Sequence, residues 1–206
     1  MEPKKRSLGA TERDEEARGA WRERLRSIDP RRLVFVDECS TNIAMVPRYA
    51  RAPRGERAYG KAPRNRGKNV TLICSLDTEG IGASMSMEGA ADGEAFGIYV
   101  EKLLCPSLRR GQIVVMDNLS VHKNRRVREL IEDRGCELWF LPAYSPDLNP
   151  IEEAFSKVKA ILKKAKARTL DALFEATHRA LGAVRSEDAR GFFGHCGYAT
   201  HRAQTL

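Results

Sequence analysis

Leu33-Val-Phe-Val-Asp37-Glu38 and Gln112-Ile-Val-Val-Met-Asp117-Asn118 are the two stretches that decide the fold of this chain. Each is a short apolar run that ends in an aspartate. Runs that are apolar on both faces are typical of strands in the centre of a sheet, covered by helices on both sides. The two stretches therefore predict central strands of an α/β domain, with Asp37 and Asp117 at the carboxyl ends of neighbouring strands.

The remaining pattern predicts antiparallel strands first and alternating strands and helices later. From Asp92 onward, apolar residues recur at helical spacing, which marks the change of pattern. A helix is also expected near 12–28, before the first strand. Further strands are expected near 42–46, 69–76, 81–87, 113–116 and 137–141, and helices at 120–134, 150–166 and 170–184.

The length and composition fit one domain with short appendages. The chain has 206 residues, and 42% of them are hydrophobic, enough for one good core. Residues 1–30 are densely charged, and we predict that they form a helical lead-in arm outside the core. We predict one α/β domain over 31–199, with a basic loop at 47–68 inserted between strands, and a tail at 200–206.

Positive charge is concentrated in two segments. The formal net charge is +8. Residues 48–68 hold eight Lys/Arg and one Glu, and residues 156–168 hold six Lys/Arg and no acid, so the rest of the chain is net acidic. Strongly basic patches favour nucleic acid or another anionic surface as the partner.

The cysteines and the hydropathy indicate a reduced, cytoplasmic protein. Five cysteines are spread along the chain without zinc-type spacing, which is typical of free thiols in a cytosolic protein. No signal peptide and no apolar stretch of membrane length are present, so no membrane partner is expected.

A third acidic residue completes a pattern suited to metal-dependent chemistry. Glu152 lies in Ser145-Pro-Asp-Leu-Asn-Pro-Ile-Glu152-Glu153, at the start of a predicted helix, and 34 residues separate it from Asp117. Mg²⁺ and Mn²⁺ prefer hard carboxylate oxygens. Two such ions about 4 Å apart can activate an attacking oxygen and stabilise a leaving one. In a basic protein, Asp37, Asp117 and Glu152 therefore predict phosphodiester chemistry on nucleic acid.

Each acid also has a purely structural interpretation. An aspartate often ends a strand as a turn or cap residue. Glu152 occupies the capping-box position of a helix with Asn149 as N-cap and Pro150 at the first helical position. Glu153 and Asp147 are rival candidates for the third acid. The role of His122, which follows Asp117 closely, is left open.

The basic segments contain the candidate DNA contacts. In the loop, a cation recurs about every third residue among Pro and Gly, which suits contacts to the phosphate backbone rather than base reading. On the helix that carries Glu152, Lys159 and Lys163 share roughly the face of the acid. Both sets could instead be solvated surface. The loop candidates are Arg48, Arg51, Arg54, Arg57, Lys61, Arg64, Arg66 and Lys68.

These residues resemble the catalytic domain of DDE transposases of the Tc/mariner-like superfamily, specifically its bacterial insertion-sequence branch. Val34-Phe-Val-Asp37-Glu38 resembles the first catalytic strand, and Val114-Val-Met-Asp117-Asn118, followed by His122, resembles the second. Leu141-Pro-Ala-Tyr-Ser-Pro-Asp-Leu-Asn-Pro-Ile-Glu152 closely resembles the Pro-rich approach to the third acid, and Arg51-Ala-Pro-Arg-Gly-Glu56 is similar to a segment common in these proteins.

The resemblance covers about residues 31–166 well and extends more loosely to Tyr198. It implies a ribonuclease-H-like fold, a mixed five-stranded sheet flanked by helices. It implies that Asp37, Asp117 and Glu152 bind Mg²⁺ or Mn²⁺, with two ions expected. It further implies cleavage of DNA at transposon ends by activated water and strand transfer by the released 3′-hydroxyl, into targets that contain TA.

The resemblance also implies partners and leaves two other interpretations open. A dimer or higher assembly on DNA is expected. Nothing here resembles the N-terminal helix-turn-helix modules of full-length relatives, so a separate chain that bears them is a possible partner. One alternative is another ribonuclease-H-like nuclease. The other is a truncated or inactive transposase fragment that binds DNA without cleaving it.

Overall fold

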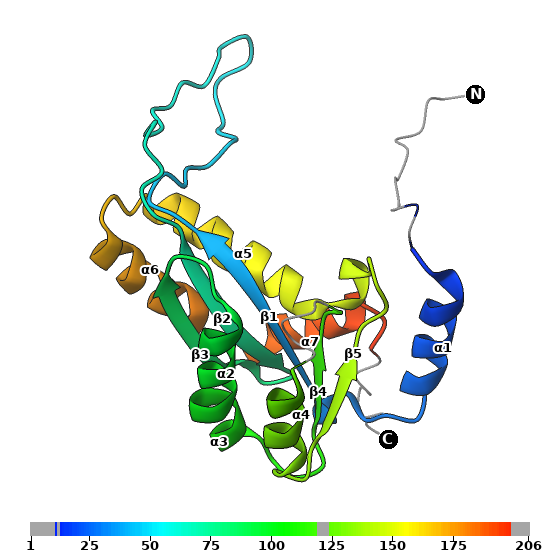
Figure 1. Ribbon diagram of the computed structural model, residues 1–206. Helices are drawn as coiled ribbons and strands as arrows, with labels where there is room; N and C mark the ends of the chain where they lie inside the picture. Colours follow the sequence, from blue (N-terminus) through cyan, green and yellow to red (C-terminus); the bar gives the residue numbers. More distant parts are fainter. Residues whose placement is uncertain (1–10, 12, 119–123, 199–206) are drawn as a thin grey trace, which may run out of the picture.

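A computed structural model of the protein describes residues 11, 13–118 and 124–198. Its centre is one mixed sheet of five strands in the order β3-β2-β1-β4-β5 (Figure 1). β2 pairs antiparallel with both β1 and β3, whereas β4 pairs parallel with both β1 and β5. The predicted mixed five-stranded sheet is confirmed. The strands are β1 (Leu33–Thr41), β2 (Val70–Asp77), β3 (Gly80–Glu88), β4 (Ile113–Met116) and β5 (Glu137–Phe140).

β1 is longer than its apolar run. It continues past Asp37 to Thr41, because β2 pairs with it along its whole second half, from Asp37 opposite Cys74 to Thr41 opposite Val70. The prediction of a separate strand at 42–46 is therefore wrong. Asn42 begins a turn there, in which its side-chain oxygen accepts a hydrogen bond from the backbone of Ala44 at 3.0 Å, as short polar side chains do.

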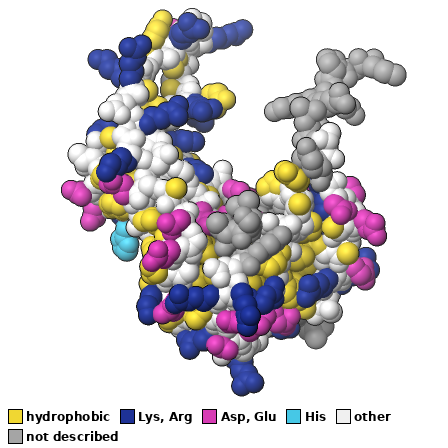
Figure 2. All heavy atoms as spheres, in the orientation of Figure 1, with side chains coloured by type: hydrophobic (Ala, Val, Ile, Leu, Met, Phe, Trp, Pro, Cys, Tyr) yellow, Lys and Arg dark blue, Asp and Glu magenta, His cyan; other side chains and the backbone are white. Residues whose placement is uncertain are grey.

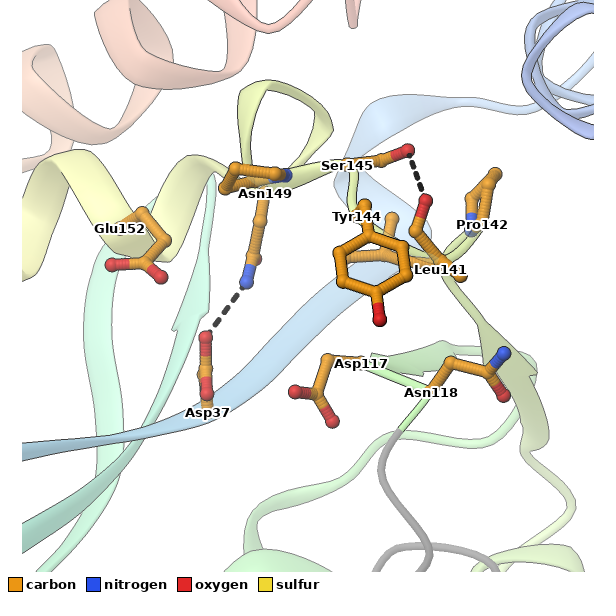
Figure 3. Close-up of a pocket in the computed structure, with 11 residues that line it drawn as sticks. Asp37, Asp117, Asn118, Leu141, Pro142, Tyr144, Ser145, Asn149 and Glu152 are labelled. Atoms are coloured by element: carbon orange, nitrogen blue, oxygen red, sulfur yellow. Dashed lines mark hydrogen bonds between the residues drawn. The ribbon is translucent and has the colours of Figure 1, made fainter. Parts of the chain in front are cut away.

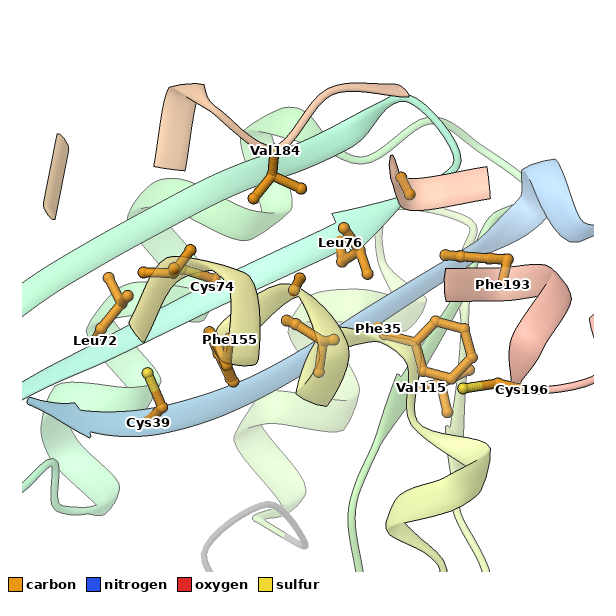
Figure 4. Close-up of a cluster of buried hydrophobic side chains, with 14 of the residues drawn as sticks. Phe35, Cys39, Leu72, Cys74, Leu76, Val115, Phe155, Val184, Phe193 and Cys196 are labelled. Carbon is orange, nitrogen blue, oxygen red and sulfur yellow. The ribbon is translucent and has the colours of Figure 1, made fainter. Parts of the chain in front are cut away.

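Four helices cover one face of the sheet. Alternate residues of the strands, such as Phe35 and Val115, point to this face and meet Phe155 and Phe193 (Figure 4). Phe35 and Phe193 pack edge to face with ring centroids 5.3 Å apart. Burial of such side chains is the main term that holds the layers together. The helices are α1 (Glu15–Leu25), α5 (Pro150–Ala165), α6 (Leu170–Gly182) and α7 (Ser186–His195).

Shorter helices cover the opposite face. The other alternate strand residues, such as Val36 and Met116, pack there against Phe96, Val127 and Ile131. α2 (Gly93–Tyr99) runs through a π-helical turn (Val100–Leu104) into α3 (Cys105–Ser107), and α4 (Arg125–Glu132) follows β4. The helix predicted at 120–134 begins at Arg125 in the part that the structure describes, and His122 lies outside the described residues.

α1 is part of the domain rather than a separate arm. Its Trp21 is buried in the main core, meets Trp139 edge to face at 5.9 Å, and donates a hydrogen bond from Nε1 to the hydroxyl of Tyr198 at 3.2 Å. The expectation that residues 1–30 lie outside the core is corrected: α1 is helical, as predicted, but packs on the sheet. α7, which was not predicted, also covers this face.

The structure also bears on membrane-spanning helices and on the state of the cysteines. Within the described residues, no helix has the length and apolar character needed to cross a membrane. Cys39, Cys74, Cys105, Cys136 and Cys196 are all buried free thiols, in agreement with the prediction of reduced cysteines.

Candidate active site

The register between β1 and β4 brings Asp37 and Asp117 to the same level. The two strands are parallel, and the last pair in the register is Val36 opposite Met116. Asp37 and Asp117 come next on each strand. Because side chains alternate along a strand, both follow Phe35 and Val115 onto the face covered by α5. Asp117 directly follows β4, as predicted, but Asp37 lies inside β1 rather than at its end.

Glu152 reaches the same place from the first turn of α5. Its carboxylate faces those of Asp37 and Asp117 across a pocket of about 380 Å³ (Figure 3). The pocket is lined by β1, by the two residues that follow β4, by the loop that leads into α5 and by the first turn of α5. The structure therefore brings all three predicted acids together, although they are far apart in the chain. The pocket is lined by Asp37, Asp117, Asn118, Leu141, Pro142, Ala143, Tyr144, Ser145, Pro146, Asn149 and Glu152.

Asn149 connects the loop to the first aspartate. Its Nδ2 donates a hydrogen bond to Oδ2 of Asp37 at 2.8 Å, and both side chains are buried (Figure 3). Asn149 stands at the N-cap of α5 but makes no side-chain capping bond. The capping-box interpretation of Glu152 therefore does not describe this helix. The sequence predicted Asn149 only as an N-cap. An Asn before Pro looks the same in the sequence whether its side chain caps the helix or binds a distant residue such as Asp37.

The site raises the pKa of Asp37. Only 8% of Asp37 is exposed. The pKa of its carboxyl is about 7, chiefly because burial penalises the charged form, and the negative charges of Glu152 and Asp117 act in the same direction. The backbone N–H of Glu38, which donates to Asp37 Oδ1 at 2.7 Å, lowers the pKa and offsets part of this rise. A cation bound next to Asp37 would therefore stabilise the charged form of this carboxylate.

In metal-free protein, Asp37→Asn should raise the stability at pH 8 and leave it almost unchanged near pH 4. The pKa of Asp37 is about 7 in the folded state and about 4 in the unfolded chain. As the pH rises, the unfolded chain therefore loses the proton first, and wild-type stability falls between about pH 4 and 7. The amide of the variant carries no charge. Its oxygen can still accept from the N–H of Glu38, and its Nδ2 can donate to Oδ1 of Asn149 once the Asn149 amide turns over. Unfolding in EDTA should show a gain on the order of 2–4 kcal/mol at pH 8, and an unchanged midpoint there would contradict the prediction.

The two rival acids are engaged elsewhere. Asp147 accepts hydrogen bonds from both terminal nitrogens of Arg18, which holds the pKa of this carboxyl below its usual range. Glu153 pairs with the ring of His195, whose pKa is raised by that contact. Neither lines the pocket with Asp37. Geometry therefore favours Glu152 as the third acid of this site.

The donor set fits a hard divalent cation. Every candidate ligand is an oxygen: three carboxylates, together with Oδ1 of Asn149, which is buried and has no hydrogen-bond partner among the described residues. Such donors suit Mg²⁺ or Mn²⁺. Within the described ranges, no three His, Cys, Asp or Glu side chains are already close enough to hold an ion together. Asp37, Asp117 and Glu152 would therefore have to draw together on binding.

The loop cations lie on a segment that projects from the body. Residues 48–68 leave the carboxyl end of β1 and return to β2, and their Lys and Arg side chains gather on this projection (Figures 1 and 2). All eight candidate cations are exposed, and Lys68 pairs with Glu88. Arg168 donates to the carbonyl of Ile43 at 2.7 Å and so ties the base of the loop to the end of α5. Lys159 and Lys163 are half-buried on α5.

Tyr144 is a pocket residue that sequence reasoning did not single out. Its φ of 52° lies in the left-handed region, which few non-glycine residues adopt. Its side chain is 60% exposed, so core packing does not account for the aromatic ring. A tyrosine between Pro142 and Pro146 gives no sequence signal of its own, and only the bend of the loop turns it toward the site.

Comparison with solved structures shows the same fold. The crystal structure of the Mos1 strand transfer complex aligns with a TM-score of 0.72 at 21% identity, covering 95% of this chain and 63% of that one. The Mos1 mariner paired end complex with Mn gives 0.70 at 20% identity, covering 95% and 64%. The catalytic domain of Mos1 mariner transposase gives 0.64 at 18% identity, covering 88% and 85%. The ribonuclease-H-like fold is therefore confirmed.

Comparison with protein-family models identifies the family as well as the fold. Comparison with curated protein sequences gave no match. The chain spans less than two thirds of the length of the Mos1 chains in the two complexes. The family model described as DDE superfamily endonuclease matches residues 32–174, more than half of the chain. This protein belongs to the DDE superfamily of endonucleases.

Proposed function

We propose that this chain is the catalytic domain of a DNA transposase, which cleaves DNA at transposon ends and joins the ends to a target. The observation that carries the proposal is the convergence of Asp37, Asp117 and Glu152 on one pocket in a DDE endonuclease. The related Mos1 structures, described as strand transfer and paired end complexes, support it.

Three carboxylates would hold the metal, and we propose two ions of Mg²⁺ or Mn²⁺. When bound, such ions supply positive charge that activates the attacking oxygen and stabilises the leaving oxygen. Asp37 is held in place by Asn149 at 2.8 Å, so its carboxylate is oriented before an ion arrives. Its raised pKa means that binding a cation displaces a proton near neutral pH.

We propose that the exposed loop cations and Lys159 and Lys163 contact the DNA backbone. Phosphate contacts of this kind position a duplex without reading its sequence. We also propose, from the resemblance, a dimer or higher assembly on DNA, membership of the bacterial insertion-sequence branch, and a cytoplasmic location with association to the nucleoid. The bounds of the domain and of the tail at 200–206 remain predictions, with α1 counted in the domain because Trp21 is buried in its core.

The test combines a structure with an activity. Crystals soaked with Mn²⁺ should show Asp37, Asp117 and Glu152 coordinating one or two ions at about 2.0–2.4 Å. The protein should nick supercoiled plasmid in Mg²⁺ or Mn²⁺ but not in EDTA, and should join pre-cleaved oligonucleotides that bear a 3′-hydroxyl.

Two outcomes would replace the proposal, and a third would change the ligand set. Nicking without joining would assign the chain to another class of ribonuclease-H-like nuclease. Salt-sensitive DNA binding with no cleavage in either metal would indicate an inactive fragment. A soaked crystal in which Glu152 stays away from the ion would exclude it as the third ligand.

A further inference from the structure

Three consecutive residues of the loop before α5 are each held by a different part of the chain. Asp147 is bound by Arg18 of α1, the carbonyl of Leu148 by Tyr198, and the side chain of Asn149 contacts Asp37 of β1. These contacts span 129, 50 and 112 residues of sequence. Residues 147–149, here called the clamped segment, immediately precede the helical turn that carries Glu152.

Arg18 binds the clamped segment in a geometry that fixes orientation. Its two terminal nitrogens donate to the two oxygens of Asp147 at 3.0 and 2.6 Å, a bidentate pair. Arg18 is 0% exposed and is the largest fully buried side chain among the described residues. A buried guanidinium is costly unless it is paired, so this contact strongly favours one position of the segment.

Tyr198 binds the next residue from the opposite end of the described chain. Its hydroxyl donates to the carbonyl of Leu148 at 2.5 Å and accepts from Nε1 of Trp21 at 3.2 Å. Its ring packs on Phe35 and Phe193, with centroids 5.1 and 5.8 Å away. α1 therefore reaches the clamped segment twice, directly through Arg18 and indirectly through Trp21 and Tyr198.

We propose that Arg18 and Tyr198 are positioning residues of the active site, through which α1 sets the placement of Asn149 against Asp37 and of Glu152 over the pocket. The inference rests on the proposed function, because it concerns the same metal site. Neither residue lines the pocket, so each would act only through the clamped segment. Loss of either contact should loosen residues 145–152 and weaken metal binding, even where the fold is retained.

Arg18→Gln separates positioning from electrostatics. Removing a positive charge near three carboxylates should, by Coulomb's law alone, leave Mn²⁺ binding equal or tighter. Loss of positioning predicts the opposite, a fall of about 10-fold or more in Mn²⁺ affinity and in cleavage rate, the size seen when outer-shell partners of metal ligands are removed. Arg26→Gln is the matched control, since it removes the same charge from the C-cap of α1, where Glu23 is the one carboxylate that Arg26 pairs with among the described residues.

Tyr198→Phe is the second variant, for the case that Arg18→Gln folds poorly. It removes only the hydroxyl and keeps the ring against Phe35. Mn²⁺ affinity would be measured by calorimetry and cleavage on supercoiled plasmid, alongside the midpoint of thermal unfolding. Hydrogen exchange would report on residues 145–152, and β4 would serve as the internal reference. Faster exchange in 145–152 with β4 unchanged, together with weaker Mn²⁺ binding, is the expected result.

Two results would overturn the inference. One is wild-type Mn²⁺ affinity and cleavage in both folded variants with only a lower unfolding midpoint, which would make Arg18 and Tyr198 purely structural. The other is an equal loss in Arg26→Gln, which would show that the loss does not depend on the contact between Arg18 and Asp147. If the wild-type protein itself neither binds Mn²⁺ nor cleaves DNA, the proposed function fails, whereas hydrogen exchange still tests whether α1 holds the clamped segment.

Discussion

Asp117→Ala should abolish metal-dependent DNA cleavage, with a loss of about 1000-fold or more, because several kcal/mol of transition-state stabilisation by bound metal would be lost. Asp117 directly follows β4 and faces the pocket beside Asp37. Among the described residues, the only other carboxylates that line the pocket are Asp37 and Glu152, and both are already needed as ligands, so no neighbouring acid can take its place. DNA affinity should be equal or higher, since the variant has one negative charge fewer near the phosphates.

Asp133→Ala is the control for this variant. Asp133 is an exposed residue at the C-cap of α4, on the other face of the sheet. The Asp133→Ala variant removes the same charge without changing the pocket, so its DNA cleavage rate and its DNA affinity should both match those of the wild type. Cleavage would be followed as nicking of supercoiled plasmid in Mg²⁺, and affinity by fluorescence anisotropy in Ca²⁺. Retained cleavage by Asp117→Ala would refute the assignment of the catalytic acids.

Neutralising four cations of the projecting loop should weaken DNA binding by about 100-fold or more at 0.1 M salt. Each phosphate contact that forms releases condensed counterions from the DNA, and this favourable release is lost with each contact that is removed. Arg51, Arg54, Arg57 and Lys61 are fully outside the core, so changing all four to Gln should leave the unfolding midpoint almost unchanged. The slope of log affinity against log salt should become shallower by up to about 3.6, at about 0.9 per contact.

The control removes the same net charge elsewhere. Lys102, Arg125, Arg126 and Arg128 are exposed or half-exposed cations on the π-helical turn and α4, on the far face of the sheet. Changing these four to Gln should reduce DNA affinity only slightly. An equal loss in both variants would mean that total charge, and not the loop, governs binding. An unchanged salt slope in the loop variant would exclude the loop as the DNA-binding surface.

Local pattern was enough to predict the sheet and the three acids. The apolar runs before Asp37 and Asp117 predict strands because residues apolar on both faces can be buried only in the middle of a layered domain. The two-residue spacing of Phe35 to Asp37 and of Val115 to Asp117 puts each acid on the same face as its partner, and the structure shows that this is the face of the aromatic core. The Pro-rich approach to Glu152 identified the family, and the family model covers it.

Tertiary structure alone decided how these residues meet. The register of Val36 opposite Met116 puts the two aspartates level, and pairing with β2 carries β1 on to Thr41 where the apolar pattern stops. Asn149, expected as a helix cap, instead hydrogen-bonds to Asp37. Arg18 hydrogen-bonds to Asp147, which lies 129 residues away in the sequence. The physical reason is that propensity and periodicity act over a few residues, whereas the position of a polar side chain depends on buried partners that only the folded chain brings near.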